Sequence, residues 1–105
     1  MKTNVLLLGG TGTLGSQIIK SKFFPNLKHP KKKILNILNK NKIENYLIKK
    51  KINLVLHCAA LARVKDCELN KSKAKKINII GTQNVVKSIL KIKKYKKKDI
   101  KLVFI

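Results

Sequence analysis

The chain has 105 residues, enough for one domain at most, and carries a formal net charge of +22. All but one of its 26 basic residues are lysine, whereas arginine, which proteins favour for bidentate phosphate and base contacts, occurs only as Arg63. We therefore expect a solvated lysine surface that binds polyanions weakly and in a salt-sensitive way, and no specific nucleic-acid partner.

A short apolar run near the N-terminus breaks into regularly spaced glycines. Val5–Leu8 has the length and branching of a buried parallel strand, and the spacing G-x-x-G-x-x-G follows it. Gly9 allows a tight turn, and Gly12 lets a ligand approach the backbone. Gly15 removes a side chain where the next helix, which begins near Thr13, packs on the sheet. The alternative is a glycine-rich turn without a ligand, but the order of strand, turn and helix favours a nucleotide site at the positive end of that helix.

The first helix leads to a weak strand. Leu14, Ile18 and Ile19 are expected to form the apolar face of this helix, which ends before Pro25. Asn26–His29 is a short strand candidate that Pro30 closes.

A capping pair predicts a second helix. Asn41 and Glu44 have the required three-residue spacing, and the helix is expected to end at Lys49–Lys51, which suits its C-terminal dipole. Its predicted buried residues are Ile43, Leu47 and Ile48.

The second half of the chain continues the alternation of strands and helices. Asn53–Ala60 predicts a strand, Asn70–Lys94 a long helix, and Lys101–Ile105 a last strand. Gly81 lies inside the long helix, where glycine costs about 1 kcal/mol against alanine, so we expect close packing to require it. Strands that alternate with helices predict an α/β fold with a parallel sheet and right-handed crossovers.

Several segments together resemble the extended short-chain dehydrogenase/reductase family, in its sugar-nucleotide branch. They cover nearly the whole chain and are most similar to the dTDP-4-dehydrorhamnose reductases. They are GGTGTLG (Gly9–Gly15), LNILN (Leu35–Asn39), HCAA (His57–Ala60), VKDCE (Val64–Glu68) and NIIGTQN (Asn78–Asn84). The resemblance implies a Rossmann-like doubly wound parallel sheet, truncated after Lys101–Ile105, with residues 1–105 forming the NAD(P)-binding portion.

The resemblance also implies which residues bind the cofactor. These are Gly9, Thr11, Gly12, Thr13, Leu14, Gly15, Asn36, Ile37, Cys58, Ala59, Ala60 and Asn78. Asn36 replaces the family's usual aspartate, so its contact to the adenine amino group is expected to be weaker.

The sequence favours NADPH over NADH as that cofactor. No acidic residue is available to hold a ribose 2′-hydroxyl, and Lys31–Lys33 occupy the region where a 2′-phosphate would lie. The alternative is that these lysines are one more solvated run, in which case NAD remains possible.

The implied activity of the full-length family member is hydride transfer from NADPH to a 4-keto nucleotide sugar. Its Tyr-x-x-x-Lys pair and sugar-binding lobe follow the strand that here is Lys101–Ile105, so we assign no catalytic residue and expect this chain alone to be inactive. Tyr46 and Lys50 have the same spacing but precede the HCAA strand, and we assign them a structural role. Three alternatives remain open: a nucleotide-sugar epimerase or dehydratase, a non-catalytic dinucleotide-binding module, and a basic nucleic-acid-binding protein.

The remaining candidate residues favour structural roles. His57 is expected to be a hydrogen-bonded core histidine and Cys58 an inert thiol, while Cys67 has no evident partner. Four acidic residues are too few for a carboxylate metal site, so no metal is expected. Neither a signal peptide nor a membrane span is evident, which predicts a cytoplasmic protein that contacts no membrane. A homodimer is possible for the full-length protein.

Overall fold

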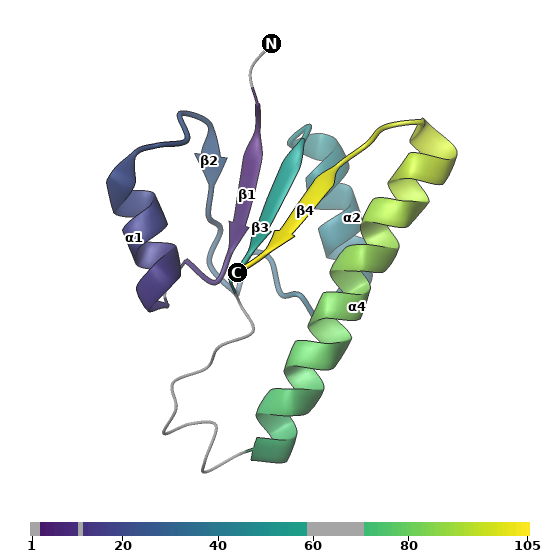
Figure 1. Cartoon of the computed structure of the whole chain (residues 1–105). Coiled ribbons are helices and arrows are strands. Elements are labelled where there is room, and N and C mark those ends of the chain that lie inside the picture. The colour runs from purple at the N-terminus through teal and green to yellow at the C-terminus, as the bar shows by residue number, and fades with distance from the viewer. Residues whose placement is uncertain (1–2, 11, 59–70) are drawn as a thin grey trace.

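The computed structural model describes residues 3–10, 12–58 and 71–105. Along the chain these form β1 (Val5–Leu8), α1 (Thr13–Ser21), β2 (Leu27–Lys28), α2 (Lys40–Lys49), β3 (Leu54–His57), α4 (Lys71–Lys96) and β4 (Lys101–Phe104) (Figure 1). The predicted alternation of strands and helices is therefore confirmed. Strand β2 is shorter than the predicted range Asn26–His29. Strand β3 ends at His57 rather than at the predicted Ala60, which lies outside the described residues.

The four described strands form one parallel sheet in the order β2-β1-β3-β4. After β1 the chain crosses to β2 on one side, and it then returns to β3 on the other side of β1 (Figure 1). This reversal makes the carboxyl ends of β1 and β3 the topological switch point, where ligands of open α/β sheets bind. The fold is Rossmann-like, as predicted.

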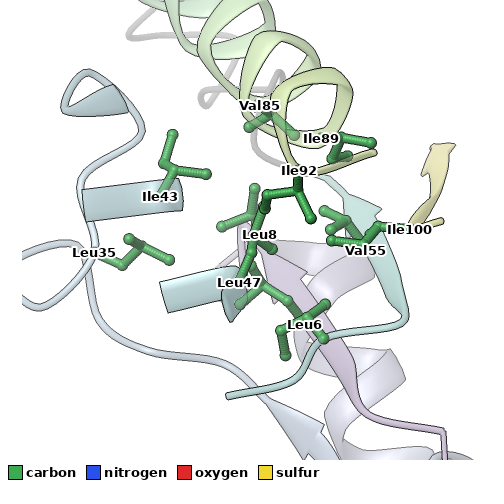
Figure 2. Packing of buried hydrophobic residues seen from close by; sticks show 11 residues of the cluster. Leu6, Leu8, Leu35, Ile43, Leu47, Val55, Val85, Ile89, Ile92 and Ile100 are labelled. Atoms are coloured by element: carbon green, nitrogen blue, oxygen red, sulfur yellow. The ribbon is translucent and has the colours of Figure 1, made fainter. Parts of the chain in front are cut away.

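Helices cover both faces of the sheet, with α1 on one face and α2 and α4 on the other (Figure 1). Successive residues of a strand point to opposite faces. Leu6 and Leu8 of β1 consequently pack with α2 and α4, whereas Val5 and Leu7 pack toward α1. The larger cluster comprises Leu6, Leu8, Leu35, Ile43, Leu47, Ile52, Val55, Val85, Ile89, Ile92 and Ile100 (Figure 2). Because β1 is buried on both faces, its unbroken aliphatic run is the expected pattern.

The start of α2 differs from the prediction. Asn39, not Asn41, is the N-cap, and its Oδ1 accepts a hydrogen bond of 3.1 Å from the Lys42 backbone N–H. Asn41 lies inside the first turn, and Glu44 instead forms an ion pair of 3.2 Å with Lys91 of α4. Two asparagines so close together offer competing caps, and the packing of α2 on α4 decides between them.

Two residues predicted to be buried are exposed. Ile43 and Leu47 are four residues apart and share the buried face of α2, but Ile48 lies about 140° around the helix from Ile43 and is 40% exposed. Leu14 is 43% exposed because it lies in the first turn of α1, while Ile18 and Ile19 pack against the sheet as predicted.

Each of the three helices that the structure describes is followed by a lysine in the left-handed region. These are Lys22 (φ 54°), Lys51 (φ 52°) and Lys97 (φ 55°). Helices commonly end in this conformation, but glycine usually provides it because it has no Cβ to strain. In this conformation a residue with a side chain lowers the stability of the fold by about 1 kcal/mol.

Replacing any of these three lysines by glycine is therefore expected to stabilise the protein. We expect the free energy of unfolding, measured by urea denaturation, to rise by about 0.5–1 kcal/mol per site and to add across the three sites. Lys50→Gly is the matched control, because Lys50 has φ −88° and gains nothing from glycine. Equal effects at Lys50 and Lys51 would show that the left-handed conformation is not the cause.

Candidate functional site

The candidate site is the switch point at the carboxyl ends of β1 and β3. Leu8 pairs with His57 in the sheet, and the Cys58 backbone N–H donates a hydrogen bond of 2.9 Å to the Leu8 carbonyl. The glycine turn that follows β1 and the segment that follows β3 thus leave the sheet side by side.

The glycine turn connects β1 to α1 with a tight bend. Gly9 has φ 86°, a conformation that favours glycine, and its carbonyl accepts a hydrogen bond of 3.1 Å from the Gly12 N–H. A Cβ on Gly15 would overlap the Gly9 carbonyl oxygen and lie 2.9 Å from the Gly10 Cα. Gly15 therefore lets α1 approach the backbone of the turn itself, rather than the sheet as predicted.

Gly12 differs from Gly15, because the residues that the structure describes leave space around it. Among the described residues, a Cβ there would meet the Gly9 carbonyl oxygen alone, at 3.4 Å. Gly12 is also the N-cap of α1, where no side chain caps the helix and no acidic residue lies in the first turn. The first N–H groups and positive dipole of α1 can therefore receive an anion such as a phosphate.

The end of β2 lies beside this turn. His29 follows β2, and its Cβ is 3.5 Å from the position that a Cβ on Gly10 would take. Lys31–Lys33 come next and are exposed. The lysines follow the strand end from which Rossmann-type sites reach the adenosine ribose.

The segment Leu35–Asn39 forms a compact turn before α2. The Asn36 Oδ1 accepts a hydrogen bond of 3.0 Å from the Leu38 N–H, and the Asn36 carbonyl accepts one of 2.9 Å from the Asn39 N–H. The Asn36 amide oxygen that was expected to face adenine therefore already holds the turn. Its second lone pair remains for a further donor.

Sequence reasoning missed two residues of α4 that contact this region. Asn84 Nδ2 donates a hydrogen bond of 2.9 Å to the Ile37 carbonyl, and Thr82 Oγ1 lies 3.1 Å from His57 Nε2. Both belong to the NIIGTQN segment, so the family resemblance already marked this part of the helix. Their partners are distant in the sequence, and local patterns do not reveal such pairs.

His57 and Cys58 are both buried at the end of β3. His57 is 1% exposed, its ring lies 5.4 Å from that of Phe104, and desolvation lowers its pKa. Its Nδ1 has no hydrogen-bond partner in the described part of the chain, so the expected core histidine is hydrogen-bonded at only one nitrogen. Burial raises the pKa of the Cys58 thiol, which keeps it neutral and weakly nucleophilic.

The structure brings the predicted residues Gly9, Gly12, Thr13, Leu14, Gly15 and Cys58 to the switch point, while Asn36 and Ile37 lie in the turn before α2. Thr11, Ala59 and Ala60 lie outside the described residues, as does Cys67. Asn78 is in α4, and its side chain is outside the described part.

Tyr46 and Lys50 belong to α2 and its C-cap, away from the glycine turn. Tyr46 packs against the larger core cluster, where burial raises its pKa, and Lys50 is exposed. Their arrangement agrees with the structural role assigned to them.

Among the residues that the structure describes, no three His, Cys, Asp or Glu side chains gather in a way that could hold a metal ion. No helix in the described ranges has the length and apolar character needed to cross a membrane.

Comparison with known proteins identifies a family for nearly the whole chain. A family model described as the RmlD substrate binding domain matches residues 1–103. A protein of Methanocaldococcus jannaschii, described as an uncharacterized membrane protein, is 33% identical over 78% of this chain and 31% of its own length.

Solved structures of two reductases are similar in both fold and sequence. The dTDP-4-dehydrorhamnose reductase of Bacillus anthracis, in complex with NADP, has a TM-score of 0.76 and 27% identity over 97% of this chain and 35% of its own. The corresponding protein of Clostridium acetobutylicum has a TM-score of 0.70 and 30% identity over 86% of this chain and 33% of its own. The chain therefore spans about a third of the length of these relatives.

Proposed function

This chain belongs to the RmlD substrate binding domain family, and on that premise we propose that it binds a nicotinamide dinucleotide across the carboxyl ends of β1 and β3. The observation that carries the proposal is the glycine turn with the uncapped N-terminus of α1 at the switch point. Three features fit a pyrophosphate there: the open space at Gly12, the free helix dipole, and the lack of acidic residues in the first turn. The similar Bacillus anthracis reductase is a complex with NADP.

NADP(H) is the form of the cofactor that we propose. A 2′-phosphate adds negative charge near the end of β2, where Lys31–Lys33 are exposed and His29 lies against the glycine turn. A lysine cluster favours that charge, whereas NAD binding commonly uses an acidic residue for the 2′-hydroxyl. NADPH is accordingly expected to bind more tightly than NADH, and the difference should shrink as salt screens the lysines.

The complete protein, in this proposal, is a reductase of a 4-keto nucleotide sugar, and residues 1–105 are its dinucleotide-binding part. Bound NADPH would supply the hydride. The residues of this chain bind the pyrophosphate at Gly9–Gly15 and orient the cofactor across the two strand ends. We assign no proton donor and no sugar-binding residue among the 105 residues.

Gly12→Val tests the proposal. Affinity for NADPH, measured by calorimetric titration of the 105-residue chain, is expected to fall at least about ten-fold, because the valine fills the space that the pyrophosphate needs. The fold should survive, since in the described ranges a Cβ on Gly12 meets a single backbone atom at an ordinary contact distance.

Gln17→Val is the matched control, because Gln17 is exposed on the next turn of α1. We expect it to bind NADPH as the parent chain does. Far-UV circular dichroism and thermal unfolding of both variants separate a loss of binding from a loss of fold. Equal NADPH affinity in a folded Gly12→Val chain, or no binding by the parent chain, would refute the proposal.

A further inference from the structure

One turn of α4 contacts both chain segments that flank the candidate site. A Cβ on Gly81 would lie 2.7 Å from Ile37 Cγ1, so glycine is what lets Ile37 pack against the helix backbone. Asn84 donates to the Ile37 carbonyl at 2.9 Å. Thr82 lies 3.1 Å from His57 Nε2 at the end of β3.

Helix geometry explains why these residues divide between two targets. Residues three apart share a helix face, so Gly81 and Asn84 both meet Ile37, while Thr82 is turned by about 100° toward β3. Asn84 and Ile37 are 47 residues apart in sequence, and Thr82 and His57 are 25 apart. The turn of α4 therefore joins parts of the chain that local sequence does not connect.

The turn at Asn36–Asn39 is held by its own hydrogen bonds, but these bonds do not fix where it sits relative to the sheet. Asn36 accepts from both Leu38 and Asn39, which closes the turn internally. Among the side-chain hydrogen bonds of the described residues, the Asn39 cap joins this turn to the next helix, α2, and the bond from Asn84 ties it to α4. Its donor is thus placed to set the position of the Asn36–Leu38 backbone.

From these contacts we infer that Asn84 is a positioning residue for the adenine end of the dinucleotide, acting through the backbone of Asn36 and Ile37. The inference rests on the proposed function and on the expectation, implied by the family resemblance, that Asn36 and Ile37 belong to the cofactor site and that Asn36 contacts the adenine. Asn84 does not contact the cofactor itself. It holds the surface on which the adenine lies, whereas the neighbouring Thr82 holds the end of β3.

Two substitutions of Asn84 test the inference. Asn84→Leu removes the amide donor at similar size, and Asn84→Ala leaves space in which water can satisfy the Ile37 carbonyl if the leucine variant does not fold. Affinities are measured by calorimetry for NADPH, for adenosine 2′,5′-bisphosphate and, by competition, for reduced nicotinamide mononucleotide. Loss of one hydrogen bond is expected to lower the affinities for NADPH and for the adenosine compound by the same factor, about five-fold. The affinity for the mononucleotide is expected to stay unchanged.

Two neighbouring variants provide the controls. Gln83→Leu alters an exposed residue of the same helix turn and is expected to change none of the three affinities. Thr82→Val removes the bond to His57 and is expected to leave the affinity for the adenosine compound unchanged.

The outcomes separate this inference from the proposed function. In one outcome, the parent chain binds NADPH while the Asn84 variants lose affinity for the adenosine compound and for reduced nicotinamide mononucleotide by the same factor. In that case Asn84 has only a general structural role, and the inference is overturned. Unchanged affinities in both folded variants overturn it as well. If the parent chain binds neither NADPH nor the adenosine compound, the proposed function itself fails, and the positioning role fails with it.

Discussion

Replacing Gly15 by alanine is expected to cost about 3 kcal/mol of the free energy of unfolding and to abolish dinucleotide binding. The added methyl group would overlap the Gly9 carbonyl oxygen and crowd the Gly10 Cα at 2.9 Å. Both are backbone atoms of a turn whose Gly9 already has φ 86°, so neither can move without pulling β1 and α1 apart. Urea denaturation of the variant measures the loss of stability, and titration with NADPH measures the loss of binding.

Gly10→Ala provides a matched control within the same turn. A Cβ on Gly10 would approach the Ile19 Cδ1 at 3.1 Å, and the end of a flexible side chain can move away. We expect a loss below about 1 kcal/mol. If both variants lose the same stability, contact with the turn backbone does not explain the requirement for glycine at position 15.

Leu6→Ala is expected to lower the free energy of unfolding by about 3–4 kcal/mol. Leu6 is completely buried in the central strand β1 and packs in the cluster with α2 and α4 (Figure 2). Neighbouring strands on both sides hold its backbone in place, so the surrounding structure cannot collapse into the cavity. Since small domains are stable by only about 5–15 kcal/mol, this variant should unfold at a markedly lower urea concentration.

The control for Leu6 is Leu90→Ala on the outer surface of α4. Leu90 is 59% exposed, and truncating it should change the free energy of unfolding by less than about 0.5 kcal/mol. A comparable loss at positions 6 and 90 would contradict the assignment of Leu6 to the core.

Much of the fold could be predicted because its strands are strong local signals. Val5–Leu8 forms β1 with the predicted bounds, since an unbroken aliphatic run is what burial on both faces of a sheet requires. The start of α1 at Thr13 follows from the glycines before it. The requirement for close packing at Gly81 is likewise confirmed, with Ile37 as the neighbour that sequence could not identify.

Other features depend on tertiary contacts that local patterns do not contain. Asn41 has the better capping pattern in sequence, since Glu44 stands three residues on, yet Asn39 is the N-cap because Glu44 pairs with Lys91 of α4 instead. Ile48 is apolar and near the helix end, yet it points away from the face that Ile43 and Leu47 share. The hydrogen bond of Asn84 could not be predicted, because its acceptor is a backbone carbonyl, which every residue possesses.

The contact between Gly81 and Ile37 also limits which substitutions these two positions can accept. Ile37 Cγ1 would be 2.7 Å from any Cβ at position 81, so every other residue type there demands a smaller one at position 37. A smaller residue at 37 alone leaves a gap against the helix. The two sites are therefore expected to change in pairs, and a redesign of the chain that alters one position must treat both as a single choice.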